Sequence, residues 1–324
     1  NEMKKFLCAL LSLAMLLSLV ACGNTSQDQS SESNTEDSSE ENTILIGISI
    51  PNKANEANMN MIQGIEDYVK DMSNVELLIL DAEGKGENHM KHAETFISRE
   101  VDVALIGPYD ASAGQPAVEA LLEAGIPTIT LKAEISDNSI CPYVGQDDAV
   151  AGEIEMQWVA DQLDGKGNIV IIEGPIGNSA QILRNEGIYK VLENYPDINV
   201  LYTQTGNWNR EEGMSLMENW LQTGAQIDAV VAHNDDMALG AYDALVDAGL
   251  DGEILCIGID AIAAAMQSVA AGELDATVLQ DSYGIGAKGI EVALKAVAGE
   301  TLESTYYIDP VLLTIDNIGD YYTG

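Results

Sequence analysis

The stretch that most constrains the fold is a strand, loop and helix between Ile227 and Gly249. It opens with a short apolar run, Ala229–Ala232, of the kind that a strand buried on both faces requires. A polar segment follows, and a helical pattern of apolar residues then continues to the glycine, an expected helix stop. Asp235 and Asp236 are predicted to cap and complement the first turn of this helix, whose backbone amides lack partners within it. The stretch is therefore one strand-and-helix step of an α/β fold.

The same order of a strand-like run and a helix-like run recurs from Thr43 nearly to the end of the chain. Such alternation favours parallel sheets joined by right-handed crossovers. It predicts two Rossmann-like lobes, each a parallel sheet flanked by helices. The predicted strands are Ile44–Ile50, Val75–Leu80, Val101–Ile106, Pro127–Leu131, Asn168–Ile172, Asn199–Thr203, Ala229–Ala232 and Glu253–Ile259. The predicted helices are Asn60–Met72, His89–Arg99, Gln115–Ala124, Ala149–Leu163, Gln181–Asn194, Glu211–Thr223, the helix ending at Gly249, and Ile262–Ala271.

Some segments break this alternation and indicate where the chain passes between the lobes. Tyr143–Asp148 is a short extended piece before a long helix, and two strand-like segments, Asp275–Gln280 and Tyr306–Thr314, follow an apparently complete second half. We expect a three-strand hinge between a first lobe of residues 43–146 plus 281–309 and a second lobe of residues 147–280 plus 310–324, because a few loop positions suffice for a hinge. The expected hinge residues are Gly145, Gln146, Asp147, Asp281, Ser282, Asp309 and Pro310.

The N-terminal residues have the pattern of an export signal. A short positive region precedes Phe6–Val20, an apolar run that is shorter than a typical membrane-spanning helix. Residues 1–21 are therefore predicted to be a signal peptide. The sequence Leu19–Cys22 resembles a bacterial lipobox, which implies a lipid on Cys22 and a place outside the cytoplasm, anchored to the cell membrane. Residues 22–42 are polar and acidic and are predicted to form a disordered tether.

Charge and cysteine content exclude several classes of partner. The 324 residues include 14 basic and 53 acidic ones, a formal charge of −39, which opposes binding to nucleic acid or anionic lipid through a basic patch. Cys141 and Cys256 lie far apart in the sequence, and whether they pair stays open, although Cys256 lies in an apolar run typical of a buried strand. No metal spacing is present among the cysteines, and we expect no metal and no cofactor.

Hydrogen-bonding side chains stand at or just after the carboxyl ends of most predicted strands. Because these ends line the ligand crevice of an open parallel sheet, we expect the side chains to surround one small molecule. Amides and carboxylates with an arginine can satisfy the hydroxyls of a sugar or polyol, and an indole face can cover its apolar C–H side. A phosphate would require glycine-rich nests and more cations. The candidate ligand-binding residues are Ser49, Asn52, Asn55, Lys132, Arg184, Trp208, Asn234, Asp260 and Gln280.

Four segments resemble the ribose-type, cluster-one periplasmic sugar-binding proteins of ABC importers, and the likeness runs over nearly all of Thr43 to Asp316. They are GNSAQILRNEG (Gly177–Gly187), HNDDMALGAYDAL (His233–Leu245), IGID (Ile257–Asp260) and LQDSYGIGAKGIE (Leu279–Glu291). The resemblance implies the type I periplasmic-binding-protein fold and a monomer that delivers a sugar or polyol to an ABC permease in the membrane. It also implies sugar contacts from Ser49, Arg184, Trp208, Asn234, Asp260 and Gln280.

The first-lobe half of the expected pocket departs from this family. Family members for pentoses and hexoses often place aromatic residues in the first loop, whereas Pro51–Met61 has none. Where ribose-like members carry an Asp-Arg pair after the fourth strand, this chain has Lys132 and Ala133. A ligand other than ribose is therefore indicated, and another aldose, a polyol or a molecule with a carboxylate for Lys132 all stay open.

Three other functions compete with solute import. A sugar-acting enzyme could use His233 as a base, but no Ser or Cys nucleophile motif accompanies it. His89 and His92 form an HxxH without a third metal ligand. A sensor that presents its ligand to a membrane receptor or kinase would use the same recognition and stays open. A sugar-responsive repressor is excluded by the export signal and by the missing basic helix-turn-helix before Thr43.

Overall fold

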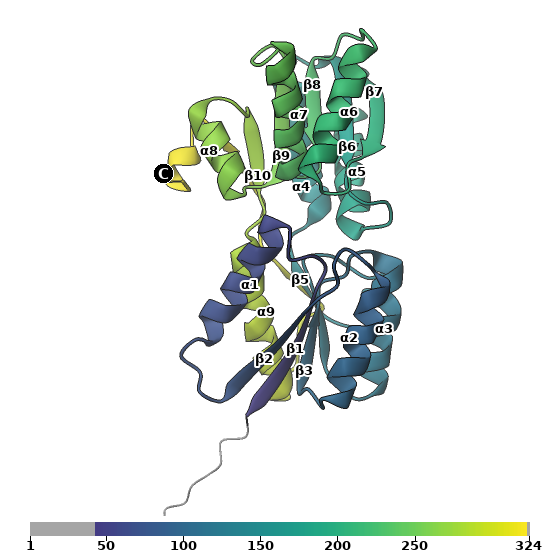
Figure 1. The fold of residues 1–324 in the computed structure, drawn as a ribbon, viewed down its shortest axis with the longest axis vertical. Helices are drawn as coiled ribbons and strands as arrows, with labels where there is room; N and C mark the ends of the chain where they lie inside the picture. Colours follow the sequence, from purple (N-terminus) through teal and green to yellow (C-terminus); the bar gives the residue numbers. More distant parts are fainter. Residues whose placement is uncertain (1–42, 323–324) are drawn as a thin grey trace, which may run out of the picture. The chain divides into compact units, whose positions relative to one another are not determined.

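Two six-stranded sheets organise residues 43–322, the part of the chain that the computed structural model describes (Figure 1). The signal peptide, the lipid on Cys22 and the tether were predicted for residues outside this range. The first sheet has the order β11-β5-β4-β3-β1-β2 and comprises β1 (Ile44–Ile50), β2 (Val75–Asp81), β3 (Val103–Ile106), β4 (Thr128–Leu131), β5 (Tyr143–Gly145) and β11 (Thr305–Tyr307). The second has the order β12-β10-β9-β8-β6-β7 and comprises β6 (Lys166–Glu173), β7 (Asp197–Thr205), β8 (Ala229–Ala232), β9 (Leu255–Asp260), β10 (Ala276–Leu279) and β12 (Val311–Thr314).

All strand pairs are parallel within the described residues except β10 with β12. Parallel strands need crossover connections, which here are helices that cover both faces of each sheet (Figure 1). The helices are α1 (Glu56–Val69), α2 (Glu87–Ser98), α3 (Ala111–Glu123), α4 (Asp148–Gln162), α5 (Ser179–Leu192), α6 (Arg210–Gln222), α7 (Asp235–Ala248), α8 (Ala263–Ala271), α9 (Ser282–Val297) and the short 3-10 helix η1 (Ile318–Asp320). The predicted two-lobe α/β fold is confirmed.

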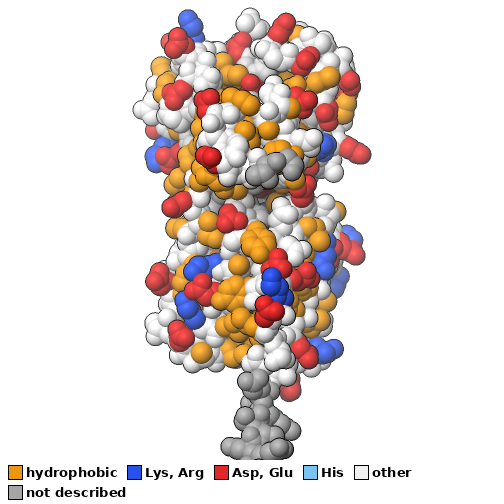
Figure 2. All heavy atoms as spheres, turned by 90° about the vertical axis from the view of Figure 1, so that its left-hand side faces the viewer, with side chains coloured by type: hydrophobic (Ala, Val, Ile, Leu, Met, Phe, Trp, Pro, Cys, Tyr) orange, Lys and Arg blue, Asp and Glu red, His pale blue; other side chains and the backbone are white. Residues whose placement is uncertain are grey.

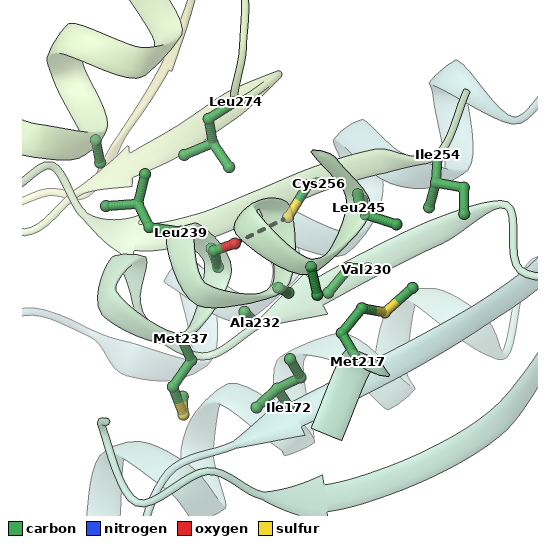
Figure 3. Close-up of a cluster of buried hydrophobic side chains, with 14 of the residues drawn as sticks. Ile172, Met217, Val230, Ala232, Met237, Leu239, Leu245, Ile254, Cys256 and Leu274 are labelled. Atoms are coloured by element: carbon green, nitrogen blue, oxygen red, sulfur yellow. Dashed lines mark hydrogen bonds between the residues drawn. The ribbon is translucent and has the colours of Figure 1, made fainter. Parts of the chain in front are cut away.

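Alternate residues of each central strand serve opposite hydrophobic cores. In β8, Val230 and Ala232 pack in the core beneath α6 and α7, whereas Ala229 and Val231 pack against α4 and α5. Figure 3 shows the first of these cores, in which the thiol of Cys256 donates to the carbonyl of Ala238 at 3.4 Å. Within residues 43–322 both cysteines, Cys141 and Cys256, are buried and free. The apolar runs of the sequence are thus strands that are buried on both faces.

No helix between residues 43 and 322 combines the length and the apolar character needed to cross a membrane. Acidic side chains are spread over the face shown in Figure 2 instead of gathering at one place. On this face the acidic charge therefore does not mark a site.

The predicted strands and helices are present, with ends displaced by a few residues, and one late helix was not predicted. Tyr306–Thr314 forms two strands, β11 and β12, in different sheets, and the connection between them contains Asp309 and Pro310, where a crossing was expected. Helix α9 was not predicted, because its glycines weaken the helical signal. Its buried residues nevertheless follow a helical spacing: Ile285, Gly286, Gly289, Ile290 and Ala293.

The chain passes between the two sheets at three places, after β5, after β10 and after β11. The residues predicted as hinges occupy these connections or the helix caps beside them. Asp147 caps α4 and Asp281 caps α9 through their side chains. Their movement, and the lobe boundaries at residues 146/147, 280/281 and 309/310, stay predictions.

Glycines allow three helix pairs to approach closely. A Cβ added to Gly64 in α1 would lie 2.0 Å from the carbonyl oxygen of Tyr283 in α9, and one added to Gly286 in α9 would lie 2.1 Å from that of Met61. The pairs α4–α5 and α6–α7 repeat this arrangement. Their close contacts are made by Gly152 and Gly187, and by Gly213 and Gly240. The backbones of each pair therefore touch without intervening side chains.

Substitution of Gly240 by alanine should destabilise the protein. The added methyl would lie 2.0 Å from the carbonyl oxygen of Arg210, and such overpacking costs about 1–3 kcal/mol, more than the helical preference of alanine returns. The matched control is Gly319→Ala, where an added Cβ meets nothing within 4 Å and the expected change is within about 0.5 kcal/mol. Denaturant unfolding of both variants measures the difference in their free energies of unfolding. Equal unfolding midpoints would contradict the close approach of α6 and α7 at Gly240.

Candidate functional site

A cavity of about 500 Å³ lies at the carboxyl ends of both sheets, lined by residues of both lobes. This is where ligands bind in open α/β sheets. Most of the predicted site residues line it, although they are spread over more than 200 positions of the sequence. Those that line it are Asn52, Asn55, Lys132, Arg184, Trp208, Asn234, Asp260 and Gln280.

Ser49 does not reach this cavity. It lies within β1, fully buried, and its hydroxyl bonds Nδ1 of His89 and Nδ1 of His92, both at 2.7 Å. Side chains alternate along a strand, so Ser49 faces α2 while its neighbours Ile48 and Ile50 face α1 and α9.

The hydrogen bonds around Ser49 fix the tautomers of both histidines. The backbone N–H of Tyr109 donates to Nε2 of His89 at 3.0 Å, so the proton of this imidazole is on Nδ1 and is donated to Ser49. The Ser49 hydroxyl can then donate to Nδ1 of His92. Burial lowers the pKa of His89 to about 4 and also lowers the pKa of His92, so both rings are neutral near pH 7. The HxxH pair thus supports the loop that carries Tyr109.

Arg184 is held by a carboxylate that the sequence prediction missed. Its Nε and NH2 donate to Oδ1 of Asp148 at 2.9 and 2.8 Å, and its NH1 donates to the carbonyl of His233. Gln146 donates from Nε2 to the same Asp148 oxygen at 2.9 Å. Both charged side chains are almost fully buried. Asp148 is the first residue of α4, directly after the predicted hinge. An acidic residue at that position is the sequence signal that could have identified it as a site residue.

Two aromatic side chains line the cavity from opposite lobes. Trp208 lies in the loop before α6, with the Arg184 guanidinium carbon 5.6 Å from the centroid of its ring. The ring needs the space left by Gly174, where an added Cβ would lie 2.1 Å from it. From the first lobe comes Tyr109, in the loop after β3. The sequence prediction missed Tyr109, although the strand-end criterion that selected the other residues applies to it as well.

Three second-lobe residues offer polar groups to the cavity. Asn234 uses Oδ1 to cap α7, accepting from the N–H of Met237 at 3.1 Å, and its amide NH₂ lies beside the carboxyl group of Asp260 at the cavity. The predicted cap function of Asp235 is therefore corrected, since Asn234 caps the helix and Asp235 is buried. Gln280 is buried, and neither its Nε2 nor its Oε1 has a hydrogen-bond partner among residues 43–322. Asp260 is buried too, which raises the pKa of its carboxyl, while Lys132 and Arg184 oppose the rise.

Lys132 projects from the first lobe. Its backbone has φ of 64°, in the left-handed region, and is held by Val144, whose carbonyl accepts from the Lys132 N–H at 2.9 Å. Its ammonium forms no hydrogen bond or ion pair with any other described residue. Burial lowers the pKa of Lys132, and the nearby Asp260 raises it. The ammonium is thus available to an acceptor in the cavity.

The cavity is balanced in charge. Three cationic and three acidic side chains of the described residues line it: Lys132, Arg184, Arg210, Glu211, Asp236 and Asp260. Arg210 and Asp236 lie 3.6 Å apart as an ion pair at its edge. Residues 43–322 contain no group of three or more His, Cys, Asp or Glu side chains that could hold a metal ion. Both donors and acceptors line the space, which suits a molecule whose groups both donate and accept, as hydroxyls do.

Removal of the Asp148 carboxylate should destabilise the protein strongly. Asp148→Ala leaves the Arg184 charge buried and unpaired, which costs about 3–5 kcal/mol. A second ion pair joins the same two helices at the surface, between Glu153 and Lys190 at 2.6 Å, so Glu153→Ala is the matched control and should cost less than about 1 kcal/mol. If both variants lose the same free energy of unfolding, the buried ion pair does not stabilise the protein more than the surface pair.

Comparison with known proteins assigns the chain to a family. Residues 46–301 match the family model described as periplasmic binding protein domain. The xylitol-binding protein of Mycolicibacterium smegmatis is 38% identical over 79% of this chain and 73% of its own length. The ribose import binding protein of Bacillus subtilis is 31% identical over 94% of this chain and 96% of its own length.

A solved structure agrees with these relatives. An ABC transporter solute binding protein from Bacillus halodurans with bound myo-inositol has a TM-score of 0.84 and 36% identity, covering 87% of this chain and 98% of that one. The two-lobe fold, the cavity at the ends of both sheets and these similarities lead to one assignment. The chain belongs to the type I, ribose-like family of periplasmic binding proteins.

Proposed function

We propose that this protein captures an uncharged sugar or polyol between its two lobes outside the cytoplasm and delivers it to an ABC importer. The observation that carries the proposal is the amide of Gln280. Both of its polar atoms are buried in the lining of the cavity without a partner among residues 43–322. Since a buried polar group without a hydrogen bond costs about 1–3 kcal/mol, a ligand that donates and accepts there is strongly favoured.

The other polar groups favour the same ligand chemistry. Lys132 and the amide NH₂ of Asn234 offer donors, whereas Asp260 offers acceptors. The equal number of positive and negative side chains at the described cavity argues for a neutral ligand over a carboxylate. Trp208 and Tyr109 can cover apolar C–H faces. A small polyhydroxylated molecule meets all of these conditions.

Among such molecules we rank polyols first. Xylitol and myo-inositol, the compounds named for two similar proteins, carry hydroxyls only. A hydroxyl can accept from the Lys132 ammonium and donate to the Asp260 carboxylate. Lys132 stands where ribose-like members carry an Asp-Arg pair, which is a further reason to place ribose lower.

Hydrogen bonds between the lobes support a clamping mechanism. On one side of the cavity the Ala111 N–H donates to the carbonyl of Gly177 at 3.1 Å, and the Asn178 amide donates to the carbonyl of Tyr109 at 2.7 Å. On the other side the Ala263 N–H donates to Glu56 at 2.9 Å. A ligand that contacts both lobes adds to these bonds and favours the arrangement in which they form.

Three features of the proposal extend beyond the family assignment. We propose that the protein leaves its ligand chemically unchanged, that it is a monomer, and that the Cys22 lipid holds it at the membrane. Recovery of unaltered polyol after incubation separates a binder from an enzyme. Adjacent genes for a permease and an ATPase separate an importer component from a sensor.

Asp260→Asn should weaken polyol binding at least about tenfold. The change keeps the shape of the side chain but removes a charged acceptor, and hydrogen bonds to charged groups contribute about 1.5–3 kcal/mol. A thermal-shift screen of xylitol, myo-inositol, ribose and sugar acids selects the ligand, and calorimetry measures its affinity. Asp251→Asn, at an exposed position, is the control and should bind like the wild type. Unaltered binding by Asp260→Asn would place the ligand elsewhere.

Glu56→Ala should weaken binding without removing any group from the cavity lining. Helix α8 has no side-chain cap of its own, and Glu56 of the other lobe accepts from its first N–H. A helix cap contributes about 1 kcal/mol, equivalent to about fivefold in affinity, through faster ligand dissociation. The control is Glu87→Ala, an exposed acid in the first turn of α2. If both variants release ligand at the wild-type rate in stopped-flow experiments, Glu56 does not contribute to closure.

A further inference from the structure

We propose that Asp235 and Thr277, which do not line the cavity, position the carboxylate of Asp260 by holding the backbone turn that follows it. The inference rests on the proposed function, since Asp260 is taken there as a ligand contact. It assigns a function in ligand recognition to two buried residues that are absent from the cavity lining. They are positioning residues and touch no ligand.

The turn after β9 is strained. Asp260 has φ of 133° and Ala261 has φ of 55°, both in the region that favours glycine, and neither residue is a glycine. Such conformations cost about 1–3 kcal/mol each and persist only where the surroundings impose them. The direction of the Asp260 side chain depends on this backbone. Whatever holds the turn therefore sets which hydroxyl of a ligand the carboxylate meets.

The two amides that follow Asp260 are both held by side chains from other elements. The N–H of Ile262 donates to Oδ2 of Asp235, at the start of α7, at 3.0 Å. The N–H of Ala261 donates to Oγ of Thr277, in β10, at 3.3 Å. The Thr277 hydroxyl in turn donates to Oδ1 of Asp235 at 2.7 Å. One carboxyl group and one hydroxyl thus connect α7, β10 and the turn.

Asp235 differs from an ordinary acidic residue at the start of a helix, because its carboxyl group is buried instead of exposed to solvent. It is fully buried, whereas the next residue, Asp236, reaches the cavity edge and pairs with Arg210. A Cβ at Gly258 would lie 2.5 Å from Oδ1 of Asp235, so the carboxyl group is seated directly against β9. Burial, with Asp260 nearby, raises the pKa of Asp235 to about 8. The contact that Asp235 makes with the Ile262 N–H gives this buried acid a structural function, which is to hold the turn.

The experiment combines variants of the two positioning residues with a variant of Asp260. Thr277→Val and Asp235→Ala should each weaken myo-inositol or xylitol binding about tenfold, within the range of coupling for one hydrogen-bond network. In an Asp260→Asn background the same changes should weaken binding less than about twofold further, because their effect acts through the carboxylate. Asp235→Asn keeps an acceptor for the Ile262 N–H and should restore most of the affinity.

The control and a ligand-free measurement separate positioning from general stability. Thr128→Val removes another buried threonine hydroxyl, which donates to the carbonyl of Ile126 in the first lobe, and should leave affinity unchanged. In the absence of ligand, Thr277→Val should accelerate hydrogen exchange of the Ala261 and Ile262 amides at least about tenfold, relative to Thr128→Val.

Two results would overturn the inference. One is that Thr277→Val lowers the affinity by the same factor in the wild-type protein and in the Asp260→Asn variant. Such additivity is expected of a residue that only stabilises the fold. The other is unchanged exchange of the two amides. If no compound of the thermal-shift screen binds the wild-type protein, the proposed function fails, and the exchange measurement alone decides whether these residues hold the turn.

Discussion

The burial of Arg184 against Asp148 is the interaction on which the cavity depends. A guanidinium placed under a ligand site must be paired, since an isolated buried charge costs several kcal/mol. Asp148 accepts two of its hydrogen bonds, and the carbonyl of His233 accepts a third. These bonds connect the start of α4, the middle of α5 and the end of β8. The floor of the second-lobe half of the cavity is therefore a single polar network.

The first lobe meets this network with a different design. Its contribution is one ammonium, one phenol ring and the asparagines before α1. Lys132 is held in position by a left-handed backbone, and Tyr109 by a buried histidine that accepts from its N–H. The second lobe supplies five of the six charged side chains that line the described cavity, and Trp208, whereas the first lobe supplies Lys132, Tyr109 and several asparagine amides.

The sequence predicted the fold well because apolar runs and helical spacing are local signals. The same holds for Asn234, Asp260 and Gln280, which lie at the carboxyl ends of strands or within two residues of them. Ser49 was placed differently because it lies inside β1, where the alternation of side chains turns it towards α2. Asp148 could not be assigned a partner, since its pairing with Arg184 spans 36 residues and depends on how two helices pack. Helix α9 was missed because glycines that serve close packing reduce the local helical signal.

Those packing glycines have a mechanical consequence. Where the backbones of two helices touch, as between Gly240 and Arg210, one helix cannot slide past the other without raising steric repulsion at once. Each lobe contains at least one such pair, so shear within a lobe is stiff. If the lobes move against one another, we therefore expect the three short connections between the sheets to absorb the backbone change, with each lobe moving as a rigid block.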